Sequence, residues 1–186
     1  GTPVTADGIA KAIAAFERTI VFANSPFDRY MQGDARAMSE SAIRGMELFM
    51  GKAECIVCHN GPNLTDNKFH NIGVPADGPI KEDLGRFNVT KNNADKGAFK
   101  TPTLRNITDT APYMHNGFFP TLFEVVQFYN GGGGRSENKS ADVHALHLST
   151  QEVEDLTEFM KALKGELVQI KYEAIPLAYP NLPKDF

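Results

Sequence analysis

The segment Cys55-Ile56-Val57-Cys58-His59 decides the fold class of this chain. It has the C-x-x-C-H spacing by which c-type haem is attached covalently to protein. Two thiols three positions apart can each add to one of the two vinyl groups of a haem. The adjacent imidazole then reaches the iron, for which histidine is a common axial ligand. We therefore predict one haem c, bound by Cys55, Cys58 and His59.

Other uses of the two cysteines have less support. A thioredoxin-like pair would need a βαβ context and would not need His59. A zinc site would need a second pair of ligands, and the sequence pairs no other histidine with a nearby cysteine. A disulfide between the two cysteines is compatible with the spacing but explains nothing else. The histidines considered are His70, His115, His144 and His147.

Length and composition limit the remaining possibilities. The 186 residues suit one domain, or two small ones. The net charge of −4, without a basic run, argues against a nucleic-acid partner, and no apolar run is long enough for a membrane span. The chain opens at Gly1 without the features of a signal peptide, so we expect a processed chain or part of a longer one. Because c-type haem is assembled outside the cytoplasm, we expect a bacterial periplasmic location.

Apolar periodicity predicts an all-α, cytochrome c-like domain with long loops. Ile9, Ile13, Phe16 and Ile20 share one face of the first helix. The predicted N-caps are Ser39 for the second helix, Thr121 with Glu124 for the third, and Ser149 with Glu152 for the fourth. The predicted helices span residues 6–23, 40–51, 121–130 and 150–164.

The loops form the other part of this prediction. Residues 61–119 are mostly irregular and too long for a loop in an ordinary compact domain. A buried haem removes that objection, because the porphyrin is a large apolar body around which loops can pack. Residues 175–186 contain three prolines, and we expect an extended tail there. The whole chain, 1–186, is taken as one haem domain.

The second axial ligand is open on spacing alone. Tyr129 shares a helix face with Leu122, Val125 and Val126, so its phenol should point inward. The simpler alternative is a buried tyrosine whose hydroxyl binds a backbone acceptor. Met160 lies on the apolar face of the last helix and is expected in the core.

Several segments together resemble the C-terminal half of the bacterial dihaem cytochrome c peroxidases and the related MauG enzymes. They extend over most of residues 8–165. Beyond the C-x-x-C-H motif, the segments are Gly61-Pro-Asn-Leu-Thr-Asp66, Phe69-His-Asn-Ile-Gly73, Leu84-Gly-Arg-Phe87, Phe99-Lys-Thr-Pro-Thr-Leu-Arg-Asn106 and Thr110-Ala-Pro-Tyr-Met-His-Asn-Gly117.

The resemblance implies a cofactor arrangement and a role. Family members carry two cytochrome c-like domains with one haem each; the N-terminal haem binds hydrogen peroxide and the C-terminal haem relays electrons. The distal ligand of the relay haem is a methionine in the peroxidases and a tyrosine in MauG, which implies Tyr129 here. A Ca²⁺ between the domains is held partly by backbone carbonyls that match Thr110 and Pro112.

The resemblance also implies partners and leaves gaps. The partners would be an N-terminal peroxidatic haem domain, and a cytochrome c, cupredoxin or protein substrate as electron donor; a homodimer would fit the peroxidases. This chain has one C-x-x-C-H motif, so no catalytic residue for peroxide cleavage can be assigned in it. It has no tryptophan, whereas MauG uses surface tryptophan for hole transfer, and Ala53 stands near that place.

The helices and loops offer further candidate contacts. Arg86 and Arg105 could each pair with a haem propionate or form an ordinary ion pair. His70 could bind a propionate or shape its loop, and His115 could tune the distal ligand through a hydrogen bond. Gly45 with Phe49, and Leu156 with Phe159, resemble the helix crossing of c-type cytochromes.

The sequence therefore supports three hypotheses. The first is the electron-relaying haem domain of a MauG-like dihaem peroxidase. The second is a stand-alone monohaem electron carrier, and the third is a haem sensor in which a small ligand displaces Tyr129. An anionic phenolate favours Fe(III), unlike a methionine thioether, so Tyr129 suits the first hypothesis better than the second.

Overall fold

The computed structural model describes residues 3–76 and 82–168, which form two compact units. The larger unit lies within Phe22–Glu166, and the described residues of the smaller unit are 3–21 and 167–168. The predicted tail, 175–186, lies outside the described residues. None of the described helices is long and apolar enough to cross a membrane.

The smaller unit contains α1, Ala6–Glu17, with Thr5 as N-cap. The prediction of a helix to residue 23 is wrong at its end, because Val21–Ala23 forms strand β1, which pairs with β4, Glu166–Val168. Thr19, Ile20 and Val21 are β-branched and favour extended backbone over helix. In the described structure α1 has no buried residue.

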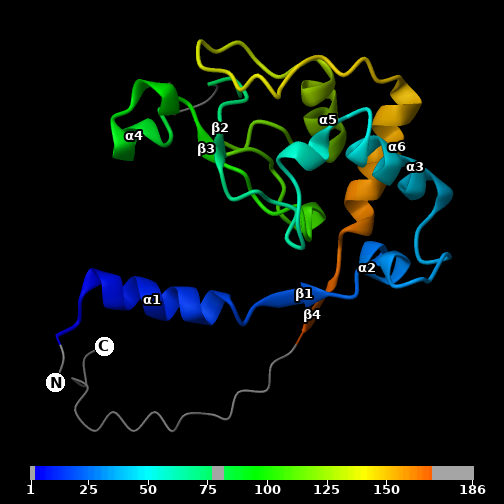
Figure 1. Ribbon diagram of the computed structural model, residues 1–186, viewed down its shortest axis with the longest axis horizontal. Helices are drawn as coiled ribbons and strands as arrows, with labels where there is room; N and C mark the ends of the chain where they lie inside the picture. Colours follow the sequence, from blue (N-terminus) through cyan, green and yellow to red (C-terminus); the bar gives the residue numbers. More distant parts are fainter. Residues whose placement is uncertain (1–2, 77–81, 169–186) are drawn as a thin grey trace, which may run out of the picture. The chain divides into compact units, whose positions relative to one another are not determined.

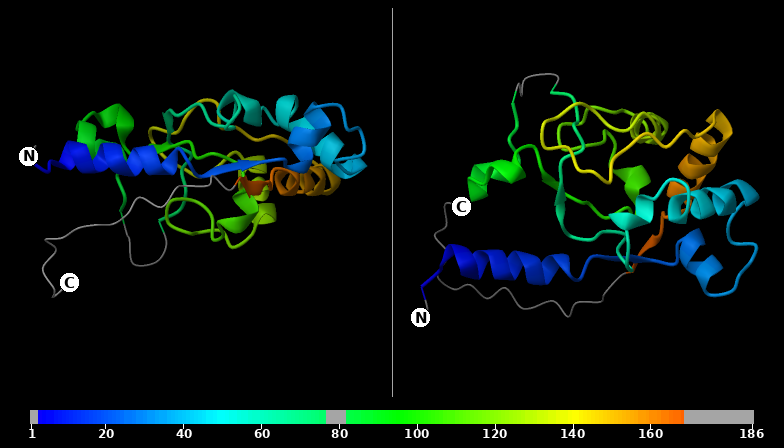
Figure 2. Two further views of the ribbon diagram at one scale, coloured as in Figure 1. Left: turned by 90° about the horizontal axis from the view of Figure 1, so that it is seen from below. Right: turned by 45° about the horizontal axis from the view of Figure 1, so that its top comes forward.

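Three of the four predicted helices form the larger unit, with nearly the predicted bounds. These are α3 (Glu40–Met50), α5 (Leu122–Asn130) and α6 (Thr150–Ala162). Their N-caps are Ser39, Thr121 and Ser149, and the last two form the capping boxes that the sequence predicts. Figures 1 and 2 show α3 and α6 side by side, with α5 next to α6.

Glycine at position 45 allows α3 and α6 to cross closely. A Cβ on Gly45 would lie 1.9 Å from the carbonyl oxygen of Asp155. The rings of Phe49 and Phe159 pack beside this point with centroids 5.1 Å apart. Both phenylalanines and Leu156 are 1% exposed. The predicted cytochrome c-type crossing is confirmed.

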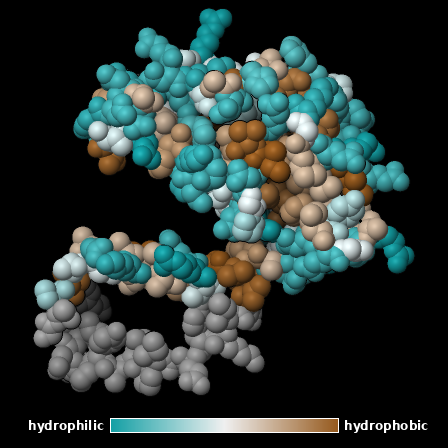
Figure 3. All heavy atoms as spheres, viewed as in Figure 1, coloured by the Kyte–Doolittle hydropathy of each residue, from teal (hydrophilic) through white to brown (hydrophobic). Residues whose placement is uncertain are grey.

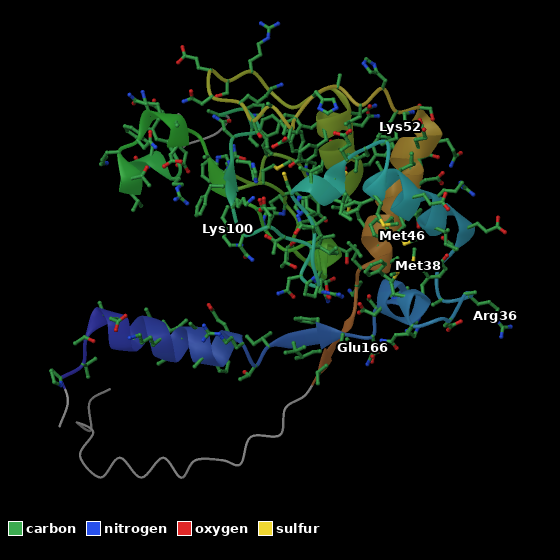
Figure 4. All side chains as sticks on the ribbon, in the orientation of Figure 1. Arg36, Met38, Met46, Lys52, Lys100 and Glu166 are labelled. Atoms are coloured by element: carbon green, nitrogen blue, oxygen red, sulfur yellow. The ribbon has the colours of Figure 1, made fainter. Side chains whose placement is uncertain are left out.

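Two ion pairs lie at the edge of the crossing, one from α3 and one from the residues just after it. Arg44 on α3 donates to Asp155 on α6, with Nε 2.8 Å from Oδ2. Lys52, labelled in Figure 4, reaches the start of α6, where its Nζ is 2.8 Å from Oε1 of Glu152. Asp155 is itself buried, so its pairing satisfies a charge inside the core.

The rest of the larger unit is irregular, as predicted, but contains short elements that periodicity did not reveal. β2 and β3 pair antiparallel, with Phe69 opposite Lys100 and His70 opposite Phe99. Each short element has six residues or fewer, which is too few to give a periodic signal. They are α2 (Pro26–Met31), η1 (Cys55–Val57), β2 (Phe69–His70), α4 (Phe87–Thr90), η2 (Asn93–Asp95), β3 (Phe99–Lys100) and η3 (Ile107–Asp109).

Candidate haem site

The larger unit encloses a cavity of about 720 Å³. This volume lies within the range of pockets that hold cofactors and other small molecules. Its lining includes residues of α3, α5 and α6 and of the loops 70–76, 97–116 and 135–146. On the face of the larger unit seen in Figure 3, hydrophobic residues reach the surface near its centre. Apolar lining residues include Phe49, Leu104, Ile107, Leu122, Val126, Leu156 and Met160.

The C-x-x-C-H motif lies at this cavity in a single tight turn. Its element η1 follows α3, and the amide of His59 donates to the carbonyl of Cys55 at 2.9 Å. Cys55, Cys58 and His59 all line the cavity. Burial raises the pKa of the Cys55 thiol to about 12 and also raises the pKa of Cys58. The predicted attachment groups therefore lie at one space.

The ring of His59 is oriented by the backbone. Its Nδ1 lies 3.0 Å from the carbonyl oxygen of Leu64, so a protonated Nδ1 donates to that oxygen. Burial lowers the pKa of His59, which keeps the imidazole neutral. A neutral ring with Nδ1 protonated presents Nε2 as a metal ligand, with the backbone fixing its tautomer.

Tyr129 lines the same cavity from the last turn of α5. Burial is the main cause that raises the pKa of its phenol, and the neighbouring thiols Cys55 and Cys58 add to it. Among the described residues no group hydrogen-bonds to the Tyr129 hydroxyl, so the alternative of a backbone acceptor has no partner there. A cavity-lining tyrosine whose hydroxyl has no hydrogen-bond partner among the described residues is suited to bind a ligand that fills the cavity.

These residues fit a c-type haem. The cavity joins apolar walls to two thiols, an oriented imidazole and a phenol, all belonging to one unit. The thiols match covalent attachment, and imidazole and phenol are both known haem-iron ligands. The predicted fold therefore places the predicted haem-binding motif at a single cavity.

Two histidines predicted near the haem also line the cavity. His70 Nε2 is 2.8 Å from Oδ2 of Asp66. Although burial opposes the charge, this contact and the amide of Lys68 lower the pKa of Asp66 to about 2. His115 stacks on the ring of Phe99 with centroids 3.6 Å apart, and burial lowers its pKa. Their predicted contacts with a propionate and with the distal ligand stay predictions.

One further histidine does lie near a cysteine in the folded chain, so the prediction that none does is wrong. Ligand atoms of Cys58, Asp66 and His70 lie within 4.8 Å of one another. The cause is a backbone turn in which the amide of Asp66 donates to the carbonyl of Cys58 at 2.8 Å. The hydrogen bond between Asp66 and His70 explains the cluster without a metal, and Cys58 keeps its place in the haem motif.

The two predicted propionate partners lie elsewhere. Arg86 pairs with Asp95 at 3.3 Å and stacks over Phe69, while Arg105 pairs with Asp28 at 2.9 Å. Neither lines the cavity, so both follow the ion-pair alternative in the described residues.

Arg135 lines the cavity and was missed by the sequence reasoning. It follows a run of four glycines that ends α5 and brings the loop against residues 72–73. A Cβ on Gly134 would lie 1.7 Å from the carbonyl oxygen of Gly73, and the Gly134 amide donates to Ile72 at 3.0 Å. The sequence signal for Arg135 was its place directly after four glycines, which permit so close a backbone approach.

The remaining predicted positions are placed as follows. Thr110 and Pro112, predicted to offer carbonyls to Ca²⁺, lie at the cavity. Met160 is buried, as predicted, and also lines the cavity. His144 and His147 are exposed.

Comparison with known proteins agrees with this site. The cytochrome c family model matches residues 42–164, and the model for di-haem cytochrome c peroxidase matches residues 1–36. Cytochrome-c peroxidase IdrP1 of Pseudomonas sp. (strain SCT) is 43% identical over 203 residues, covering 93% of this chain and 54% of that protein. Methylamine utilization protein MauG of Methylorubrum extorquens is 37% identical over 174 residues, covering 94% of this chain and 49% of that protein.

A solved structure extends the similarity to three dimensions. The crystal structure of a MauG-like protein associated with microbial copper homeostasis aligns with a TM-score of 0.75 at 34% identity, covering 88% of this chain and 58% of that chain. This chain spans about half the length of the curated relatives it matches. The matched residues include the whole C-x-x-C-H site, and the chain belongs to the cytochrome c family, in the group of the di-haem cytochrome c peroxidases and MauG.

Proposed function

We propose that this chain is the electron-relaying c-type haem domain of a MauG-like dihaem peroxidase. The observation that carries the proposal is that one cavity is lined both by the oriented His59 and by Tyr129, whose hydroxyl has no hydrogen-bond partner among the described residues. The family comparison supports it over a stand-alone carrier, because the relatives are peroxidases and MauG about twice as long as this chain. The whole protein would reduce hydrogen peroxide with electrons from a small redox protein or a protein substrate.

Each residue of the site has a role in this proposal. Cys55 and Cys58 would hold the cofactor covalently, and the carbonyl of Leu64 would keep His59 Nε2 available to the iron. When bound, a c-type haem supplies one-electron transfer at its iron. Tyr129 would be the distal ligand, and it would have to give up its hydroxyl proton to bind as phenolate. The apolar walls would exclude water from this pair.

The anionic oxygen of Tyr129 would set the redox range of the domain. A phenolate is a hard, negative donor that favours Fe(III), whereas a methionine thioether favours Fe(II). The domain would therefore have a low midpoint potential and would pass oxidising equivalents between a partner haem and an electron donor. A high-potential carrier would need the opposite ligand chemistry.

The proposal includes surroundings that this chain alone does not contain. The N-terminal peroxidatic haem domain would lie in the part of the relatives that this chain does not cover. Ca²⁺ would bind carbonyls of Thr110 and Pro112, next to the haem cavity. Haem c is attached to its two thiols outside the cytoplasm, which supports a periplasmic location. A homodimer would fit the peroxidases.

Substitution of Tyr129 in the haem-loaded chain tests the proposal. Tyr129→Met should raise the midpoint potential by on the order of 0.1 V or more, since axial ligands set haem potentials over about 0.8 V. Tyr129→Phe should change the electron paramagnetic resonance spectrum by removing one ligand. Tyr113→Phe is the matched control, because Tyr113 lines the same cavity from a loop. Unchanged potential and spectrum in both Tyr129 variants would refute ligation.

Peroxide turnover tests the rest of the proposal. The haem-loaded chain alone should reduce hydrogen peroxide slowly or not at all, and the full gene product should reduce it and carry two haems. Rapid turnover by the chain alone would contradict a relay role. A full gene product with one haem would favour the carrier or sensor instead.

A further inference from the structure

Asn130, the last residue of α5, clamps the end of this helix with its side-chain amide. Its Nδ2 donates to the carbonyl oxygen of Leu148 at 3.0 Å, and the backbone amide of Leu148 donates to its Oδ1 at 2.8 Å. Its own carbonyl accepts from the amide of Leu146 at 3.1 Å, and a bridge between Gly131 and Ala145 continues the pairing. These contacts fix the last turn of α5 to the segment that leads into α6.

Tyr129 directly precedes this clamp and lines the haem cavity. Its hydroxyl has no hydrogen-bond partner among the described residues, so no polar contact in that part of the chain sets the direction of the phenol. The ring packs against the edge of Phe128, with centroids 5.8 Å apart, and Phe128 belongs to the same last turn. The direction of the phenol therefore depends on where the backbone of this turn is held.

The last turn of α5 needs support from outside the helix. Helix ends fray, because their final carbonyls have no partner within the helix. Here four glycines follow Asn130, and the amides of Gly132 and Gly133 donate to the carbonyls of Tyr129 and Phe128 at 2.9 and 3.0 Å. Because a glycine run has wide conformational freedom, it holds the helix end loosely. Asn130 supplies the fixed point.

A second clamp of the same kind lies at the other end of α6. Asn106 Nδ2 donates to the carbonyl oxygen of Gly165 at 3.2 Å, and the amide of Gly165 donates to its Oδ1 at 3.0 Å. Asn106 is buried and does not line the cavity. The two asparagines make the same pair of hydrogen bonds, one just before α6 and one just after it. Only Asn130 adjoins the proposed iron ligand.

We propose that Asn130 is a positioning residue for Tyr129. Its amide holds the last turn of α5 in place, so that the phenol is presented to the cavity in one arrangement. This strengthens ligation, because a ligand that is already ordered loses less conformational freedom when it binds. The proposal rests on the proposed function, from which it takes Tyr129 as the distal ligand.

Competition with cyanide measures how firmly the phenol is held. Cyanide must displace the distal ligand to reach the iron, so its apparent dissociation constant falls by the factor by which the internal ligand is weakened. Asn130→Asp keeps the size of the side chain but replaces the donor to the Leu148 carbonyl with an oxygen. We expect the dissociation constant of cyanide, titrated in the visible spectrum of the haem-loaded chain, to fall about fivefold. The added negative charge disfavours an anion, so it cannot produce this fall.

Asn106→Asp is the matched control. It removes the equivalent donor at the other end of α6 and should leave the dissociation constant of cyanide unchanged. Hydrogen exchange checks that both clamps are weakened: amides of residues 145–148 should exchange about fivefold faster in Asn130→Asp, and those of residues 163–165 in Asn106→Asp. Equal falls of the dissociation constant in the two variants would overturn the proposal, because they would show a general loosening of the domain.

Tyr129→Phe separates this proposal from the proposed function. It should lower the dissociation constant of cyanide further than Asn130→Asp does. If Tyr129→Phe has this effect and Asn130→Asp has none, the proposal is overturned and the proposed function stands. If Tyr129→Phe leaves the constant unchanged, Tyr129 is not the distal ligand, and both the proposed ligation and this proposal are wrong.

Asn130→Gln serves as the second variant if Asn130→Asp does not take up haem. It keeps the amide but moves it by one methylene, so the dissociation constant of cyanide should fall less than in Asn130→Asp and in the same direction. An unchanged constant in Asn130→Gln, with faster exchange at residues 145–148, would overturn the proposal.

Discussion

The α3–α6 crossing and the loop wall of the cavity bury apolar surface in different ways. We define the loop wall as residues 61–76 and 82–119. At the crossing, side chains of one helix fill spaces on the other, with Phe49 and Phe159 both 1% exposed. The loop wall has short elements joined by turns and faces a cavity of about 720 Å³. The crossing is complete within the chain, whereas the loop wall needs a cofactor to pack against.

Removing the attachment thiols should separate the two regions most strongly. Cys55→Ser with Cys58→Ser would abolish covalent haem binding and leave the loop wall facing an unfilled apolar space. We expect loop-wall amides to lose at least about a hundredfold of their exchange protection, while α3 and α6 amides keep most of theirs. The measurement is hydrogen exchange on the variant and on the haem-loaded wild type. Equal loss in both regions would mean that the crossing also depends on haem.

Filling the gap at Gly45 attacks the other region. A Cβ at this position would lie 1.9 Å from the Asp155 carbonyl oxygen, so Gly45→Ala forces the helices apart. We expect a loss of about 3 kcal/mol in the free energy of unfolding, measured by denaturant titration of the haem-loaded chain.

Gly8→Ala is the control for this substitution. Gly8 also lies in a helix, and a Cβ there would meet only the hydroxyl of Thr5, at 3.2 Å. Helix propensity alone would make alanine better than glycine by about 1 kcal/mol. A stabilised Gly45→Ala chain would therefore show that the crossing is not close-packed at this point.

The same contrast explains what could be predicted from the sequence. The helices α3, α5 and α6 have local signals, namely caps at Ser39, Thr121 and Ser149 and an apolar spacing near 3.6. The C-x-x-C-H motif is also local, since attachment needs only a tight turn. These parts of the fold and site could be read correctly because neighbouring residues determine them.

The features that could not be predicted from the sequence depend on tertiary packing. The partner of Arg105 is Asp28, 77 positions away in the sequence. The Cys58–Asp66–His70 cluster depends on a turn, and the exposed face of α1 depends on a unit boundary. None of these follows from periodicity, because loop conformation and domain division are decided by tertiary packing.

Breaking the buried ion pair of the crossing should have a moderate, pH-dependent effect. The hydrogen bond from Arg44 is the largest cause that lowers the pKa of Asp155 to about 2 from an ordinary 3.8. A lowered folded-state pKa stabilises the protein above pH 4, and this stabilisation is lost as the pH falls toward 2. We expect it to amount to about 2 kcal/mol at neutral pH.

Asp155→Asn should remove this stabilisation and flatten the fall in unfolding free energy between pH 4 and 2. Asp109→Asn is the matched control, because Asp109 pairs with Lys164 on the surface, where ion pairs contribute little. Unfolding curves at several pH values decide the matter. A pH profile unchanged by Asp155→Asn would contradict the assigned pKa.

The smallest expected effect concerns the charge of Arg135, which lies outside the loop wall but lines the same cavity. Of the arginines in the described residues, Arg135 lines the cavity, whereas Arg86 and Arg105 are paired with carboxylates. A cation near the haem stabilises the reduced form, so Arg135→Gln should lower the midpoint potential by about 20 to 40 mV. Arg86→Gln and Arg105→Gln should shift it less, because each removes a charge already balanced by aspartate. Redox titration could instead show the larger shift for Arg86→Gln or Arg105→Gln. The propionate contacts predicted from the sequence would then be right, because the arginine would bind a haem propionate in place of its aspartate. The cofactor would then rearrange the loop wall.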